Sequence, residues 1–581
     1  MTDRTTGRFA LLRQLIADGI PCLFGNPGSS EENLLDALQD PEFASLRYYL
    51  GLQEACVVGM ADAYARASPP RLLPGDLRPW RRPAVVQLHS YAGLANGLGM
   101  IYGAKRGGTP MVVIAGEAGL AYEALDGQMA ADLTAIARPF VKSDHNGPCA
   151  WRVVDERSLL RLVRRAVKTA ATPPCGPVFL SLPMDVLDRP VPDPVVRTLP
   201  VASRVLPDGD TLRAAARLLA DAARPLILIG DGIAASGAQG ELSELALRVG
   251  ATVWGGNDSE VNIAASHPLY RGPLDHMFGE ANRARLAEAD VVLVCGTTLF
   301  PEVFPVPDAV FAAGAKLIHI DLDAAEIGKT HPVTIGALGD PKLTLAALAE
   351  ELTGLIDGPR REAIRDRRDR LRRETAAARE AALARDAAAE ARGGLTLSRF
   401  ARALAARLPP DALIFDEALT SSPELMRHLP RDEPGHYFQT RSGMLGTGLP
   451  GAIGLKVAQP ERTVVGFCGD GGGISTIQAL ATAARYDIGA KIVVCNNRSY
   501  RILELNLREY RRGLGLPPDA PFPESFDLAE PALRFDRLAQ AQGVNAVRVD
   551  APEQIEPALD AAFADPGAPF LIELILDPAL S

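Results

Sequence analysis

Short apolar runs without polar alternation, separated by stretches of helical periodicity, limit most strongly how this chain can fold. Clear examples are MVVIAG at 111–116, VVLVC at 291–295 and KIVVC at 491–495. A strand of this kind must be covered on both faces, as in a parallel sheet between two layers of helices. The sequence therefore predicts an α/β fold made of parallel sheets.

The alternation of strand and helix patterns occurs in three successive blocks, and 581 residues are enough for several domains. We predict α/β domains over 1–188, 206–352 and 395–581. A proline-rich stretch at 190–207 links the first two domains. Residues 353–394, rich in Arg, Ala and Glu, form a helical connector to the third. The predicted architecture is three consecutive parallel-sheet α/β domains.

Charge and composition exclude several classes of protein. The formal net charge is −10, which disfavours binding to nucleic acid, and we interpret the basic cluster at 360–373 as a solvated helix face. The other basic cluster, at 78–82, belongs to the proline-rich loop 68–83, for which a surface loop is favoured and a lid near the site is the alternative. No apolar run is long enough to span a membrane, and the N-terminus lacks the apolar core of a signal peptide. The seven cysteines include no CxxC pair. We expect a cytoplasmic protein with reduced thiols and no membrane partner.

Two predicted strands of the third domain end in polar loops. Strand 463–468 runs into the glycine-rich stretch 469–473, and strand 491–495 runs into two asparagines, with a spacing of 27 residues from Asp470 to Asn497. The carboxyl ends of neighbouring parallel strands meet at one edge of a sheet, where ligands bind. Carboxylate and amide oxygens suit Mg²⁺, and glycines let backbone N–H groups approach a diphosphate. The spacing therefore predicts a site for Mg²⁺ and a diphosphate.

This combination resembles the thiamine diphosphate enzymes, whose signature is GDG, a spacer of this size and then NN. The resemblance implies that thiamine diphosphate and Mg²⁺ are cofactors. It implies that Asp470, the side chain of Asn497 and the backbone carbonyl of Ser499 ligate the metal. It also implies a set of residues around the cofactor in this domain, namely Thr420, Gly443, Met444, Leu445, Asp470, Gly471, Gly472, Asn497 and Tyr500.

Within that set, two residues have distinct implied tasks. Leu445 separates the two rings of the cofactor, and the Gly443 carbonyl accepts a hydrogen bond from its exocyclic amine. Leu445 is equally suited to be a core leucine. Thr420 matches a position that touches the diphosphate, and an exposed turn hydroxyl is the alternative.

Glu54 follows a predicted strand and begins an otherwise apolar helix. Taken alone, it is interpreted as a first-turn glutamate that stabilises the helix dipole. The resemblance implies instead that Glu54 binds the aminopyrimidine of the cofactor, and so belongs to both the catalytic and the cofactor-binding set. There it promotes the imino tautomer, which takes the proton from thiazolium C2 and generates the ylid.

The resemblance covers nearly the whole chain and is greatest to the benzoylformate decarboxylase and acetolactate synthase branch. The stretches LFGNPGSSE, GLQEACVVGMADAYA, QLHSYAGLANGLG and GTGLPGAIGLKVAQPER carry it. It implies that Ser29 contacts the substrate and that His89 transfers protons. A helix cap for Ser29 and a hydrogen-bonded histidine at a strand end for His89 are the alternatives. The segment 299–305, aligned with a second family histidine, contains none, which weakens the case for an aryl substrate.

The activity implied by the resemblance is decarboxylation of a 2-keto acid to an aldehyde and CO₂, through ylid and enamine intermediates, by a carbon–carbon lyase. A carboligase of the acetolactate synthase or benzaldehyde lyase kind and a catalytically silent scaffold are the alternatives. The glycine-rich turn at 230–237 resembles a dinucleotide cradle, so bound FAD or ADP stays open, and a structural role is favoured. The resemblance also implies a homodimer core, assembled into a homotetramer, with each cofactor between two chains.

Overall fold

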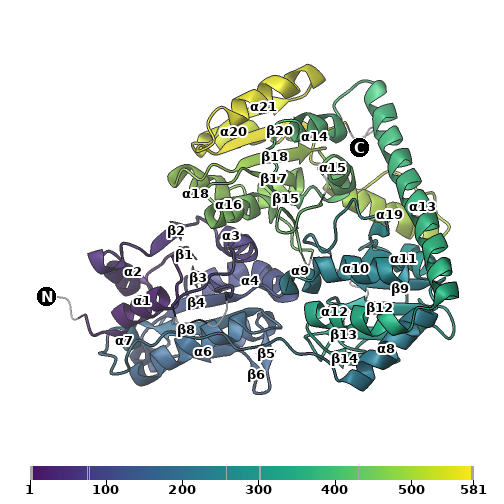
Figure 1. Ribbon diagram of the computed structural model, residues 1–581. Helices are drawn as coiled ribbons and strands as arrows, with labels where there is room; N and C mark the ends of the chain where they lie inside the picture. The colour runs from purple at the N-terminus through teal and green to yellow at the C-terminus, as the bar shows by residue number, and fades with distance from the viewer. Residues whose placement is uncertain are drawn as a thin grey trace.

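The computed structural model describes residues 4–74, 76, 79–256, 258–299, 302–429, 431–441 and 443–577. Three six-stranded sheets follow one another along the chain, and neighbouring strands are parallel throughout each sheet (Figure 1). The predicted fold class, three consecutive parallel-sheet α/β domains, is confirmed. Arg78, in the basic cluster at 78–82, lies outside the described residues.

The first sheet has the strand order β2-β1-β3-β4-β8-β7. Alternate strand residues point into two separate cores: Phe24 and Val86 pack under α3 and α4, while Leu23 and Val85 pack under α1 and α6. Both faces are covered, which explains the uninterrupted apolar runs. The elements are α1 (Gly7–Ala17), β1 (Cys22–Gly25), α2 (Glu32–Leu38), β2 (Arg47–Leu50), α3 (Glu54–Ala67), β3 (Ala84–Leu88), α4 (Ser90–Arg106), β4 (Met111–Glu117), α5 (Leu133–Ala137), the short hairpin β5 (Ser143–Asp144) and β6 (Gly147–Pro148), β7 (Ala150–Arg152), α6 (Leu159–Ala171), β8 (Pro177–Pro183) and α7 (Met184–Leu187).

The central sheet has the order β11-β10-β9-β12-β13-β14. The long helix α13 then leads from this domain to the third along one side of the molecule (Figure 1). Most of its side chains are exposed, as expected for a connector. The elements are α8 (Gly209–Asp221), β9 (Pro225–Ile229), α9 (Gly232–Ser236), α10 (Gln239–Val249), β10 (Thr252–Gly255), β11 (Tyr270–Pro273), α11 (Gly279–Leu286), β12 (Val291–Cys295), β13 (Lys316–Asp321), β14 (Ile335–Leu338), α12 (Pro341–Glu351) and α13 (Gly358–Ala391).

The third sheet has the order β16-β15-β17-β18-β20-β19. Its elements are α14 (Leu397–Ala405), β15 (Leu413–Glu417), α15 (Ser422–His428), β16 (Tyr437–Gln439), α16 (Gly448–Ala458), β17 (Val464–Gly469), α17 (Asp470–Ser475), α18 (Ala479–Arg485), β18 (Lys491–Asn496), α19 (Arg501–Gly513), α20 (Phe535–Ala541), β19 (Asn545–Val549), α21 (Ile555–Phe563) and β20 (Phe570–Ile575). No helix among the described residues has the length and apolar character that crossing a membrane requires.

The strand orders create a switch point in each sheet, where the chain first builds to one side and then to the other. In the first sheet this point lies between β1 and β3, and in the third between β15 and β17. Crevices outside the carboxyl ends of strands at such points are the usual ligand sites of open α/β sheets. The central sheet has its switch point between β9 and β12, so the fold indicates one candidate edge in each domain.

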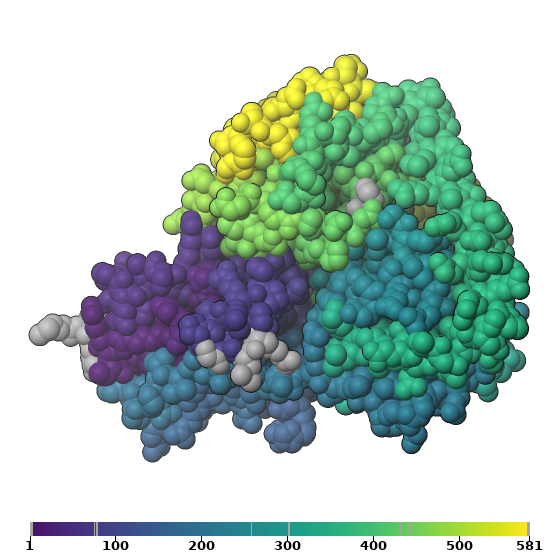
Figure 2. Space-filling model, viewed as in Figure 1, coloured from purple at the N-terminus to yellow at the C-terminus, as the bar shows by residue number. Residues whose placement is uncertain are grey.

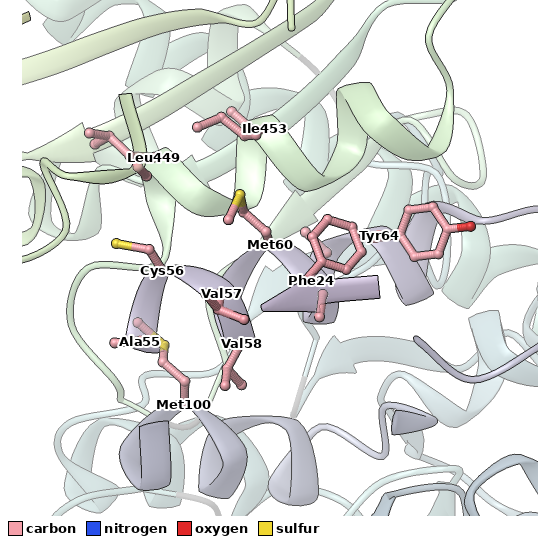
Figure 3. Packing of buried hydrophobic residues seen from close by; sticks show 14 of the residues in the cluster. Phe24, Ala55, Cys56, Val57, Val58, Met60, Tyr64, Met100, Leu449 and Ile453 are labelled. Carbon is pink, nitrogen blue, oxygen red and sulfur yellow. The ribbon is translucent and has the colours of Figure 1, made fainter. Parts of the chain in front are cut away.

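Helices α3 and α16 pack directly on each other and join the first domain to the third (Figure 3). Cys56 and Met60 of α3 belong to the same buried cluster as Leu449 and Ile453 of α16. The backbones approach so closely that a Cβ at Gly454 would overlap the Met60 carbonyl oxygen. A shared core of this kind fixes the relative position of the two domains.

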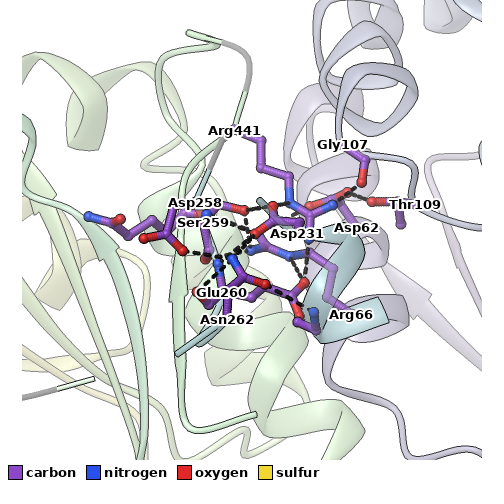
Figure 4. Close-up of polar contacts among 12 residues, drawn as sticks. Asp62, Arg66, Gly107, Thr109, Asp231, Asp258, Ser259, Glu260, Asn262 and Arg441 are labelled. Atoms are coloured by element: carbon purple, nitrogen blue, oxygen red, sulfur yellow. Dashed lines mark hydrogen bonds and ion pairs between the residues drawn. The ribbon is translucent and has the colours of Figure 1, made fainter. Parts of the chain in front are cut away.

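A buried charge cluster connects the central domain to the other two domains. Figure 2 shows the three domains packed against one another. Arg66 of α3 pairs with Glu260 at 3.2 Å, and Arg441 of the third domain pairs with the same carboxylate (Figure 4). Asp231 and Ser259 of the central domain complete the cluster. Buried charges are tolerated only when paired and hydrogen-bonded, so this junction requires the three domains to keep this arrangement.

Candidate active site

Glu54 is the first residue of α3 and is only 6% exposed. Its two carboxylate oxygens accept hydrogen bonds from side-chain amides, Oε1 from Asn26 Nδ2 at 2.9 Å and Oε2 from Asn96 Nδ2 at 3.1 Å. Gln53, whose Oε1 accepts from the Cys56 N–H at 3.1 Å, caps the helix. Glu54 therefore lies in the first turn, near the positive end of the helix dipole, without being the cap.

His89 lies at the carboxyl end of β3, directly before α4, at the switch point of the first sheet. Its Nδ1 is 3.0 Å from Glu31 Oε2 and 3.1 Å from Ser30 Oγ. When Glu31 is ionised it can only accept, and Nδ1 then carries the hydrogen of this bond. Glu31 also accepts from the backbone N–H groups of Gly28 and Gly116, and burial raises the pKa of its carboxyl.

Ser29 is exposed beside this group, and it is Ser30 that contacts His89. The sequence analysis did not identify Ser30 and Glu31 as site residues. The signal for them was present, because both follow Ser29 in the same turn. The structure places Ser29, Ser30, Glu31 and His89 together at one edge of the first sheet.

Asp470 and Asn497 occupy neighbouring turns at the carboxyl ends of β17 and β18, as predicted from their spacing. Asp470 Oδ2 accepts the Arg498 N–H at 2.7 Å, and Asn497 Oδ1 accepts the Ser499 N–H at 3.0 Å. Burial raises the pKa of Asp470 to about 6, while the surrounding backbone N–H groups oppose the shift. Among the described residues, no Lys, Arg or His forms an ion pair with this buried carboxylate.

These features fit a hard divalent cation and a diphosphate. A buried carboxylate without a cationic partner, an amide oxygen with a lone pair to spare and a backbone carbonyl are the ligands that Mg²⁺ accepts together with phosphate oxygens. In the described part of the chain, no three His, Cys, Asp or Glu side chains gather to hold a metal. The site therefore suits a metal ion whose remaining ligands are phosphate oxygens of a bound diphosphate.

The remaining predicted cofactor residues surround the same edge of the third sheet or lead up to it. The Tyr500 ring packs against Gly471, and Thr420 is half-buried in the turn after β15. Leu445 is half-buried, Gly443 is exposed, and Met444 extends to Gly99 of α4. Ser442, in the same segment, lies outside the described residues.

Backbone strain is concentrated at these edges. The described part of the chain has five non-glycine residues with positive φ, and three of them lie at these edges: Ser90 directly follows His89, Leu419 precedes Thr420 and Arg498 follows Asn497. The left-handed region costs an ordinary residue about 1 kcal/mol or more. Such strain is retained mainly where function requires a particular backbone path.

Within one chain, the candidate residues of the first domain and those of the third do not share hydrogen bonds among the contacts described above. The hydrogen bonds of Glu54 and His89 described above all stay in the first domain, and those of Asp470 and Asn497 stay in the third. The first domain does reach α17 of the same chain, because Cys56 Sγ contacts the Thr476 carbonyl at 3.5 Å.

At the switch point of the central sheet, the loops that follow β9 and β12 contact each other. In the glycine-rich turn after β9, the Gly232 N–H donates to the Gly296 carbonyl, and Asp231 accepts from Ser259 and Glu260 N–H groups. These internal contacts favour the structural interpretation of the turn. Phe300 and Pro301, in the segment without a histidine, lie outside the described residues.

Candidate edges on the parallel sheets of the first and third domains, with a further α/β domain between them in the chain, are typical of multidomain α/β proteins that bind a cofactor. The chain matches three family models: the N-terminal TPP binding domain of thiamine pyrophosphate enzymes at 5–136, their central domain at 212–348 and their C-terminal TPP binding domain at 420–574. The chain belongs to the family of thiamine pyrophosphate (thiamine diphosphate) enzymes, which confirms the resemblance found in the sequence.

Relatives of known name lie in the expected branch. The chain is 32% identical to a benzoylformate decarboxylase of Pseudomonas aeruginosa, over 96% of both chains. It is 28% identical to a probable acetolactate synthase large subunit of Methanocaldococcus jannaschii, over 99% of this chain and 92% of the other. The solved structure of a thiamine diphosphate-dependent 4-hydroxybenzoylformate decarboxylase from Rhodococcus jostii RHA1 is similar with a TM-score of 0.80 at 26% identity, covering 98% of this chain and 99% of the other.

Proposed function

We propose that this thiamine diphosphate-dependent enzyme decarboxylates a 2-keto acid to an aldehyde and CO₂, with Mg²⁺ as the second cofactor. The observation that carries the proposal is His89, held by Ser30 and Glu31 at the switch point of the first sheet. When CO₂ leaves, the keto carbon keeps an electron pair and must gain one proton before an aldehyde is released. An imidazole at this edge is a suitable donor, because either of its ring nitrogens can carry a proton and release it.

The cofactor would supply the carbon nucleophile and the sink for that electron pair. Glu54 would hold a proton at the pyrimidine nitrogen and Ser29 would bind the substrate carboxylate. Nδ1 of His89 is engaged by Glu31, so Nε2 is the atom that would exchange a proton with the substrate. Asp470, Asn497 and the Ser499 carbonyl would hold the metal, and Thr420, Gly471, Gly472 and Tyr500 would surround the diphosphate, with Gly443, Met444 and Leu445 at the rings.

A screen of 2-keto acids for CO₂ release, with added thiamine diphosphate and Mg²⁺, tests this function. At least one aliphatic or aryl 2-keto acid should be converted to its aldehyde without an acceptor. His89→Ala should lower this turnover by roughly a hundredfold, since a positioned acid or base contributes at least that much. If no 2-keto acid loses CO₂ in the presence of both cofactors, the decarboxylase proposal is wrong.

A carboligase is the second candidate, favoured by the segment 299–305, which carries no histidine where a benzoylformate decarboxylase would have one. In such an enzyme, the carbon that has lost CO₂ would bond to the carbonyl carbon of a second compound instead of taking up a proton. Product analysis with and without an acceptor aldehyde distinguishes the two: a carboligase forms a hydroxyketone, and a decarboxylase releases aldehyde in both reactions.

We further propose that the complete site forms between two copies of this chain. Exposed apolar side chains flank both edges: Leu52 and Tyr91 near Glu54 and His89, and Leu503, Leu505 and Tyr510 on α19, which follows Tyr500 and has no buried residue. Exposed apolar surface around a site commonly marks an interface. A second copy would cover both edges and exclude water from the cofactor.

Mixing two inactive variants tests this arrangement. Glu54→Gln and Asp470→Ala chains, dissociated and reassembled together, should recover about a quarter of the wild-type activity, because half of the dimers are mixed and each has one intact site. Each variant alone, treated in the same way, is the control. If mixed dimers form and no activity returns, the site lies within one chain.

A further inference from the structure

Glu417, at the carboxyl end of β15, is a buried carboxylate to which the sequence assigned no role. It is 1% exposed, and its two oxygens accept from two backbone N–H groups: Oε1 from Gly446 and Oε2 from Gly448, both at 2.6 Å. Gly448 begins α16, so Glu417 lies at the positive end of that helix. Burial raises the pKa of Glu417 to about 7, and the N–H groups of residues 446–448 oppose the shift.

The backbone of Gly446 is held at its carbonyl as well as at its N–H. Its carbonyl accepts from Thr476 Oγ1 at 2.8 Å, at the end of α17. Gly446 has φ +90, and a Cβ there would overlap Ser475 Oγ and lie 2.9 Å from Thr476 Cγ2. Only glycine fits this position, and its backbone is fixed between Glu417 and Thr476.

This fixed point directly follows Gly443, Met444 and Leu445, the residues expected at the rings of the cofactor. Thr440 also contacts the segment, since its hydroxyl accepts from Thr447 Oγ1 at 2.8 Å and donates to the Met444 carbonyl at 3.5 Å. Glu417 also lies beneath the glycine loop, since a Cβ at Gly472 would be 3.2 Å from its Oε2. One carboxylate thus contacts both loops that are proposed to enclose the cofactor.

We propose that Glu417 is a positioning residue for thiamine diphosphate: its two oxygens hold Gly446 and Gly448 so that Gly443–Leu445 keep the backbone path that receives the cofactor. The inference rests on the proposed cofactor site and adds to it a residue that does not touch the cofactor. A carboxylate suits this task because it accepts at both oxygens. A glutamine would accept one N–H and turn its own NH₂ group toward the other.

Glu417→Gln therefore serves as the main variant. In the cofactor-free protein, hydrogen–deuterium exchange of the 443–450 segment should become faster, because one of the two amides loses its acceptor. The dissociation constant of thiamine diphosphate, measured by titration calorimetry in saturating Mg²⁺, should rise about tenfold. At saturating cofactor most of the turnover should return, since no reacting atom is removed.

Asp18→Asn is the matched control. Asp18 is also fully buried and accepts from a backbone N–H, that of Thr198 at 2.6 Å, but it lies in the first domain beside α1. This variant should lose about as much thermal stability as Glu417→Gln does, and it should keep the wild-type dissociation constant of thiamine diphosphate. If Glu417→Gln fails to fold, Thr476→Val removes the other anchor of Gly446 and should speed exchange in the same segment.

The outcomes separate this inference from the proposed function. Wild-type affinity and wild-type exchange in the Glu417→Gln variant, or an equal loss of affinity in Asp18→Asn, would overturn the positioning role. If the wild-type protein itself binds no thiamine diphosphate with Mg²⁺, the proposed function fails, while the exchange measurement still decides whether Glu417 holds the segment.

Discussion

The Asp470→Ala variant is expected to lose Mg²⁺-dependent binding of thiamine diphosphate, with a dissociation constant at least about a hundredfold above that of the wild type. Asp470 supplies the one carboxylate in the proposed ligand set. Without it, Mg²⁺ would be held too weakly to balance the negative charge of the diphosphate. Titration calorimetry with thiamine diphosphate, at a series of Mg²⁺ concentrations, measures the effect.

Asp470→Asn separates the charge from the local structure. Asp470 accepts the Gly471 N–H at Oδ1 and the Arg498 N–H at Oδ2, and an asparagine keeps an oxygen for one of them. This variant should therefore still fold, with a smaller loss of thermal stability in the cofactor-free protein than Asp470→Ala, and should lose most of the affinity. Wild-type affinity in either variant would show that Asp470 does not hold the metal.

Glu54→Gln should slow exchange of the cofactor C2 proton by roughly a hundredfold or more, because an amide cannot hold the proton that a carboxylic acid shares with the pyrimidine ring. The substitution is nearly isosteric, and the flanking Asn26 and Asn96 amides can reorient to accept as well as donate. Folding and cofactor affinity should therefore change little. NMR in deuterated water measures the exchange rate.

The internal control for Glu54→Gln is the dissociation constant of thiamine diphosphate, which should stay within a few-fold of the wild type. A large loss of affinity would assign Glu54 to binding rather than to proton transfer. Exchange at the wild-type rate, with cofactor bound, would remove Glu54 from the catalytic set.

The sequence alone determined the three parallel sheets and the position of both candidate edges. Uninterrupted apolar runs such as 291–295 require cover on both faces, so a buried strand can be predicted from the run itself without knowledge of distant residues. Asp470 and Asn497 could be paired from their spacing, because each directly follows a strand of the same sheet. Glu54 and His89 were found by resemblance, and their local positions at a helix start and a strand end were readable from the chain.

Four of the six strands at the outer positions of the sheets were not predicted. Strands β7, β11, β14 and β16 have three or four residues each, and all lie at or next to the outer positions of the sheet order. Such segments have too few residues for a periodic pattern. Their pairing is decided by the neighbouring strand, which provides the hydrogen-bonding partners and one covered face.

Only the tertiary structure decided which polar groups support the site. Glu31 reaches His89 across 58 residues, Glu417 reaches Gly446 across 29, and Arg66 reaches Glu260 across 194. A buried carboxylate is stable only if donors from other elements satisfy it, and the chain folds those donors into place without any local pattern in the sequence. The sequence thus located the residues that follow the strands, while three-dimensional packing selected the buried groups that hold them in position.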